Sequence, residues 1–127
     1  MKSTFVGLFL LFASIVCQAE QLLFHCSFPT QADGNSQKFV KQDFGFKILV
    51  ESSETGVKAS MIGEIATPLF ARFGSFGQIS LIEETGVGNL NITTILTTGE
   101  AVHSRHVQVS EQQSLFSQQY GKCLPKN

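Results

Sequence analysis

The sequence predicts an all-β domain, either a small antiparallel β-barrel or a β-sandwich of seven or eight short strands. Three observations lead to this fold class. Segments of alternating apolar and polar residues recur about every ten residues, with turn-forming residues between them. No helical period of apolar residues is found beyond the N-terminal segment. Cys26 and Cys123 lie in the first and last alternating segments.

The N-terminal segment Met1–Ala19 has the features of a secretory signal peptide. Lys2 gives it a positive start, and Phe5–Val16 form an apolar run of about a dozen residues. That run is shorter than the roughly 20 apolar residues of a membrane-spanning helix. We expect cleavage after Ala19 and a single β domain over residues 20–127, in the periplasm or outside the cell.

The cysteines predict one disulfide bond. Cys17 lies in the signal segment, so Cys26 and Cys123 are left in a chain that enters an oxidising compartment. Their bond would close the domain and make the first and last strands neighbours, because bonded cysteines need nearby Cα atoms. Two buried thiols are the alternative. Lipid modification of Cys17 is disfavoured, since the preceding Val16 is not small.

The first half of the domain has the clearest alternation. The expected strands there are Gln21–Phe28, a short segment at Phe39–Val40, Phe44–Glu51 and Val57–Ile62. Pro29 ends the first of them, and Thr30–Gln37 form a polar turn. Ser52–Gly56 have the composition of a hairpin turn.

The second half begins with an irregular stretch and ends with long alternating segments. We expect no strand in Gly63–Pro68, and Leu69–Gly77 bring three phenylalanines and two glycines close together. The expected strands are Gln78–Glu83, Leu90–Leu96, Glu100–Val109 and Leu115–Cys123. Glycine-containing turns separate the middle ones.

Charge argues against several classes of partner. The formal net charge is −1, with acidic and basic residues interspersed. Nucleic-acid binding needs a clustered basic face, which the sequence lacks. Cys26 and Cys123 are too far apart, and without C-x-x-C spacing, to suggest zinc. We predict a monomer with no cofactor and no metal.

The segment His103–His106 draws attention because it holds two histidines and an arginine. Residues three apart on a strand point to opposite faces, with Cα atoms about 10 Å apart, so the histidines cannot share a metal without a bulge. Ser104 and His106 share a face, as a nucleophile and its base would. No G-x-S-x-G elbow or acid accompanies them, and we predict no catalytic residues.

The remaining candidates are binding residues. Arg105 shares a strand face with apolar residues, where it either pairs with an acid or meets an anion in a groove. Tyr120 is expected to hydrogen-bond at a barrel rim. The phenylalanines of Leu69–Gly77 either present an interaction surface or plug one end of a barrel. The possible binding residues are His103, Arg105, His106, Tyr120, Phe73 and Phe76.

Short motifs at both ends carry a resemblance. Phe24-His25-Cys26, Ala101–His106 and Phe116–Cys123 resemble the ends of small exported proteobacterial β-domain proteins of uncharacterised function. That likeness implies a terminal disulfide and a periplasmic address, and no activity. The chain is also distantly similar to the periplasmic inhibitors of C-type lysozyme, which are small β-barrels with cysteines near their termini. Their Ser- and Gly-rich inhibitory loop is absent here, with only Gly74–Gly77 in its place.

These observations favour an exported bacterial module that binds or inhibits an envelope protein or glycan without catalysis. A structural or stress-related envelope protein without a ligand is the first alternative. A small hydrolase using Ser104 and His106 is the second.

Overall fold

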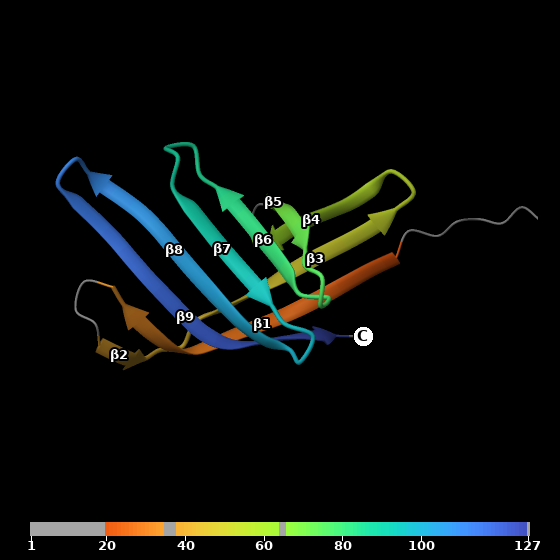
Figure 1. Cartoon of the computed structure of the whole chain (residues 1–127), viewed down its shortest axis with the longest axis horizontal. Helices are drawn as coiled ribbons and strands as arrows, with labels where there is room; N and C mark the ends of the chain where they lie inside the picture. The colour runs from red at the N-terminus through yellow and green to blue at the C-terminus, as the bar shows by residue number, and fades with distance from the viewer. Residues whose placement is uncertain (1–19, 35–37, 64–65, 127) are drawn as a thin grey trace, which may run out of the picture.

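The computed structural model describes residues 20–34, 38–63 and 66–126 (Figure 1). The expected signal segment, Met1–Ala19, lies outside these ranges. Within them the chain forms β-strands and no helix. The strands are β1 (Glu20–Asp33), β2 (Lys38–Lys41), β3 (Gly45–Ser53), β4 (Gly56–Ile62), β5 (Thr67–Phe73), β6 (Ile79–Glu84), β7 (Leu90–Ile95), β8 (Glu100–Ser110) and β9 (Gln113–Lys126).

The strands form one antiparallel sheet that closes on itself. Neighbours follow the order β2-β1-β3-β4-β5-β6-β7-β8-β9, and β9 also pairs with β1. Closure makes an eight-stranded barrel of β1 and β3–β9 in the described part of the chain, with β2 paired outside it to the end of β1 (Figure 1). The all-β prediction is confirmed, and the fold is a barrel rather than a sandwich.

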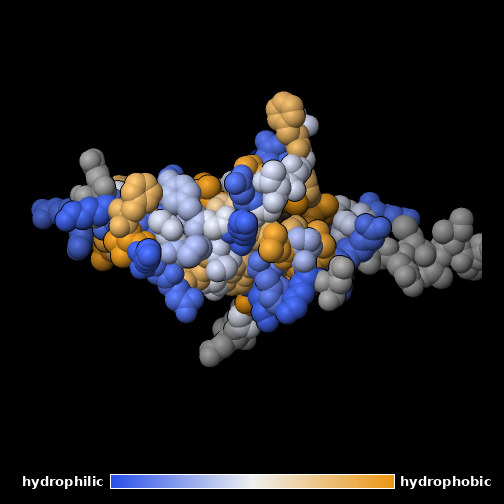
Figure 2. Space-filling model, turned by 90° about the horizontal axis from the view of Figure 1, so that it is seen from below, coloured by the Kyte–Doolittle hydropathy of each residue, from blue (hydrophilic) through white to orange (hydrophobic). Residues whose placement is uncertain are grey.

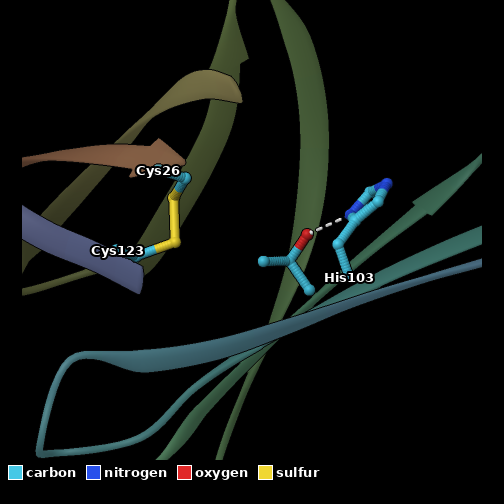
Figure 3. Close-up of a disulfide and its surroundings, with 4 residues drawn as sticks. Cys26, His103 and Cys123 are labelled. Carbon is cyan, nitrogen blue, oxygen red and sulfur yellow. Dashed lines mark hydrogen bonds between the residues drawn. A yellow bond between two sulfur atoms is a disulfide. The ribbon is translucent and has the colours of Figure 1, made fainter. Parts of the chain in front are cut away.

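A disulfide joins the strands at which the barrel closes. The Cys26 and Cys123 sulfurs are 2.02 Å apart, and the Cα atoms are 4.0 Å apart (Figure 3). The two cysteines face each other in the β1–β9 ladder, and both are buried. The predicted bond and the predicted adjacency of the first and last strands are therefore confirmed.

Strand β1 continues where the sequence predicted a turn. The ladder of β1 with β9 shifts register between Ser27 and Thr30, and this irregularity takes up Pro29, which has no N–H to donate. Beyond it Thr30–Asp33 pair with β9 and β2. The predicted turn is thus wrong over Thr30–Asp33, while residues 35–37 lie outside the described ranges. A Cβ at Gly121 would clash with the Ser27 carbonyl oxygen at this shift, which explains the glycine.

Strand β5 covers residues that showed no clear alternation. Its ladders are short, with three residue pairs to β4 and four to β6. Pro68 lies in the ladder with β4, opposite Ser60. A strand this short with a proline gives little periodic signal, so the expectation of irregular structure at Thr67 and Pro68 is wrong.

Two regions can be distinguished inside the barrel. One end, which we call the apolar half, lies toward the β3–β4 and β7–β8 turns and contains the core. The core consists of Phe24, Cys26, Phe28, Ile48, Val50, Ala59, Leu81, Ile95, Ala101 and Cys123. The opposite end lies toward the β6–β7 and β8–β9 turns, and its inward-facing residues are mostly polar. We call it the polar half.

The outer surface carries scattered apolar side chains. Figure 2 shows hydrophobic residues interspersed with hydrophilic ones on one face. The most exposed large hydrophobic side chains are Phe76, Val87, Phe39 and Phe70. No helix within the described residues is long and apolar enough to cross a membrane.

Candidate functional site

The polar half is built from two rows of inward-facing side chains, defined by the strand registers. The inner row, next to the core, contains Thr93, His103, Gln119 and Gln31 on β7, β8, β9 and β1. The outer row, nearer the open end, contains Glu83, Asn91, Arg105, Ser117 and Asp33 on β6, β7, β8, β9 and β1. Side chains at alternate positions share a face, so each row lies on the interior wall.

His103 is the buried centre of the inner row. Its side chain is 3% exposed, and Nδ1 lies 2.8 Å from the Thr93 hydroxyl oxygen (Figure 3). The rings of Phe44 and Phe46 lie 5.8 and 5.1 Å from the imidazole. Burial, helped by the positive charge of Arg105, lowers the pKa of His103 to about 4. The imidazole is therefore neutral at pH 7.

Gln119 is buried without an evident partner. Its side chain is 2% exposed, and Oε1 has no hydrogen-bond partner among the described residues. Buried polar atoms are nearly always hydrogen-bonded, because leaving one unpaired costs about 1 to 3 kcal/mol. The oxygen is therefore an unused acceptor in the barrel interior, next to Gln31 in the β1–β9 ladder.

The outer row combines charges with further unused hydrogen-bonding capacity. Asn91 donates from Nδ2 to Glu83 Oε2 at 3.0 Å, while Asn91 Oδ1 is buried and has no partner in the described ranges. Arg105, two strands from Glu83 in the same row, is exposed. Thr85, where the β6–β7 turn begins, has a buried Oγ1 that likewise lacks a partner within residues 20–34, 38–63 and 66–126. These oxygens concentrate at one end of the barrel.

Two adjoining cavities lie at this end. The smaller measures about 130 Å³, and Gln31, Asp33, Arg105 and Ser117 are among the residues that line it. The larger measures about 300 Å³ and shares Asp33, Arg105 and Ser117, with His106 added. Phe116 borders both and is about half exposed. The larger cavity is lined from both faces of the wall, with Arg105, Asp33 and Ser117 at inward positions and His106 and Phe116 at outward ones.

The predicted binding residues are divided among three places. Arg105 and His106 line the larger cavity, whereas His103 lies in the interior and away from solvent. Tyr120 is on the outer face, where its hydroxyl donates to Gln118 Oε1 at 2.6 Å and its ring lies 6.3 Å from that of Phe39. The expected hydrogen bond of Tyr120 is thus present.

Phe73 and Phe76 lie at the opposite end of the barrel. They are 57% and 88% exposed, so they do not plug it, and that interpretation of the aromatic stretch is wrong. The turn between β5 and β6 carries Phe76 into solvent. Whether these rings bind a partner is a separate prediction.

The pairs considered for chemistry are not assembled into a reactive group. His103 and His106 lie on opposite faces of β8, as strand geometry predicted. No hydrogen bond joins Ser104 to His106 in the described ranges, and the His106 ring meets Phe116 edge-on at 6.2 Å. No three His, Cys, Asp or Glu side chains among the described residues converge as metal ligands would.

Sequence reasoning missed most of the polar half. Asp33 and Gln31 fall in the predicted turn Thr30–Gln37, and Gln119 is not among the predicted binding residues. A signal for this polar interior was present in the sequence. Polar residues such as Asn91 and Thr93 occupy every second position of a strand rich in β-branched residues. To recognise the polar half, one must know which residues of each strand face inward and which lie side by side, and this depends on the register between strands.

Comparisons with protein families, curated proteins and solved structures give no match to this chain. The resemblance of its ends to small exported proteins remains a prediction. Arguments about function therefore rest on the polar half itself.

Proposed function

We propose that the protein is an exported, non-catalytic binding module that holds part of an envelope protein or glycan in the polar half of its barrel. One observation carries the proposal: buried oxygens of Gln119 and Asn91 have no partner among the described residues, and their ladder neighbours Gln31 and Arg105 line cavities at this end. An eight-stranded barrel has an interior just wide enough for side chains or one small ligand. Leaving acceptors unpaired costs stability, which a bound group would offset.

The test is a binding comparison of the mature chain with a variant that lacks the cation. Arg105→Met should lose binding to any partner found among envelope glycans and proteins, while Arg72→Met should retain it. Arg72 is exposed on β5 and lines neither of these two cavities. Equal binding by both variants would contradict the assignment of function to this end.

Export itself is tested by processing. Mass spectrometry of the protein recovered from its native compartment should find Glu20 as the first residue. A lipid-modified Cys17 at the N-terminus would instead indicate an anchored protein.

The proposal that the protein is not an enzyme is tested by activity assays. Purified protein should show no esterase or peptidase activity, and Ser104→Ala should change nothing measurable. An activity that Ser104→Ala abolishes would favour the hydrolase alternative.

A second candidate is an inhibitor or binder of a protein, acting through the opposite end. Phe73 and Phe76 are 57% and 88% exposed, and exposed aromatic rings are enriched where proteins bind each other. Phe76→Ser would abolish such an interaction and leave binding at the polar half intact. Absence of binding by the parent chain to any envelope protein or glycan would favour a structural protein without a ligand.

A further inference from the structure

We propose that the ligand of the polar half is a neutral saccharide unit, such as the end of a glycan, held by its hydroxyl groups. This inference rests on the proposed function and specifies its ligand. It follows from the balance of charge, the balance of donors and acceptors, and the aromatic ring at the cavities.

Charge argues against a simple anion. Arg105 alone would attract a carboxylate or phosphate. The outer row, however, holds Glu83 and Asp33 on either side of Arg105, each two strands away. At a strand spacing of about 4.8 Å, each acid begins about 10 Å from Arg105 along the wall. Lys38 pairs with Asp33 at the end of this row, so the row balances two carboxylates against two cations and has no net charge to hold an anion.

Hydrogen-bonding capacity argues for a ligand that both donates and accepts. Gln31 on the wall of the smaller cavity carries both an acceptor oxygen and a donor amide group. Arg105 offers only donors, and Ser117 offers either role. A hydroxyl group donates one hydrogen bond and accepts others without carrying charge. Several hydroxyls on one ring would satisfy this mixed wall without the desolvation cost of a charge.

Shape supports the same ligand class. The larger cavity, of about 300 Å³, is at the lower end of the range for small-molecule sites. Phe116 stands at its border, about half exposed, with the His106 ring packed edge-on against it. A pyranose ring has an apolar face of C–H groups that can cover such an aromatic ring while its hydroxyls reach Arg105 and Asp33. Ligand sites commonly combine an apolar ring with a few placed polar groups in this way.

The experiment uses the oxidised mature chain, residues 20–127. A glycan array is followed by calorimetric titration with glucose, galactose, N-acetylglucosamine and their disaccharides. Glucuronic acid is titrated as the acidic comparison ligand, and free alanine as the zwitterionic one. We expect saturable binding of at least one neutral saccharide, and no preference for its acidic counterpart.

Three variants locate the site. Ser117→Ala and Arg105→Met should each weaken that binding by about tenfold or more, the change expected for one lost ligand hydrogen bond. Phe116→Ala should weaken it as well. Arg72→Met is the matched control and should bind as the parent does.

The outcomes separate the two proposals. Binding of alanine or glucuronic acid alone, lost in Arg105→Met, would overturn the saccharide and leave the proposed function standing. A neutral saccharide that binds all variants equally would overturn the site. No binding by any probe in array or titration would overturn this inference, while a protein partner lost in Arg105→Met would preserve the proposed function.

Discussion

The two halves of the barrel interior are built from the same strands but contain different chemistry. On β8, Ala101 packs into the core, whereas Arg105, one row beyond His103, lies at the open end. On β9, Cys123 is bonded in the core, while Ser117 lines the cavities. The apolar half gains stability by burying hydrocarbon, and the polar half leaves hydrogen-bonding capacity unused. Burial of apolar groups thus concentrates at one end of the interior, and unpaired hydrogen-bonding groups at the other.

The largest expected effect concerns the disulfide of the apolar half. Cys26 and Cys123 are separated by 97 positions, and closing a loop of that size is worth about 4.7 kcal/mol in lost entropy of the unfolded chain. Cys26→Ser with Cys123→Ser should therefore lower the free energy of unfolding by several kcal/mol or prevent folding, as measured by denaturant titration. Two titratable thiols in the unreduced native protein would contradict the bond.

A second prediction concerns pH at the border of the halves. The pKa of His103 is about 4 in the folded state, against 6.5 for an ordinary solvated imidazole. As pH falls below 6.5 the unfolded chain takes up the proton first, so stability is lost between pH 6.5 and 4. The full loss is about 3 kcal/mol, from the difference between these two pKa values. Denaturant titrations near neutral pH and near the lower of the two pKa values should show this loss.

His103→Leu should reduce that pH dependence, because no buried imidazole then resists the proton. Thr93→Val is the control: it removes the hydroxyl near Nδ1 and keeps the buried ring, so most of the dependence should remain. Identical pH profiles for the parent and His103→Leu would contradict the assignment.

A third prediction has the opposite sign. Gln119→Met should raise the free energy of unfolding by about 1 kcal/mol, because it replaces an unpaired buried amide oxygen by an apolar chain of similar size. Gln118→Met on the outer face loses the acceptor for Tyr120 and should not stabilise. Thermal unfolding of the pair measures the difference, and a destabilised Gln119→Met would indicate a structural role for the amide.

The smallest effect is expected on the outer surface. Phe76→Ser should change stability by no more than about 0.5 kcal/mol, since the ring is 88% exposed. A clearly lower melting temperature of the variant would instead support the interpretation that this ring closes the end of the barrel.

Sequence patterns predicted the apolar half better than the polar one. Phe24, Ile48 and Val50 stand at alternate positions of their strands, and burial of that face explains both the pattern and the strands. The cysteine pair predicted the closing seam correctly. The polar half was missed because Asp33 and Gln31 follow a proline, whose usual effect is to end a strand. Here the register shift after Ser27 keeps β1 in the sheet.

Of the candidate site, the sequence indicated Arg105 and His106 but not their neighbours. The row from Glu83 to Asp33 joins five strands, and only the ladders show that these residues lie side by side. Neither Asn91 nor Ser117 has a local signal that separates it from any polar strand residue. Burial of His103 likewise depends on the rings of Phe44 and Phe46, far away in sequence.

The short ladders of β5 determine where hydrogen bonds of this barrel open most readily. Strands β7 and β8 share six residue pairs, whereas β5 is held by three pairs on one side and four on the other. The disulfide between Cys26 on β1 and Cys123 on β9 keeps these two strands from separating. Local opening is thus confined to the opposite wall, and amide hydrogens of β5 should exchange with solvent deuterium well before those of β8. The barrel is thus held covalently where its first and last strands meet, and its weakest strand pairing is at β5.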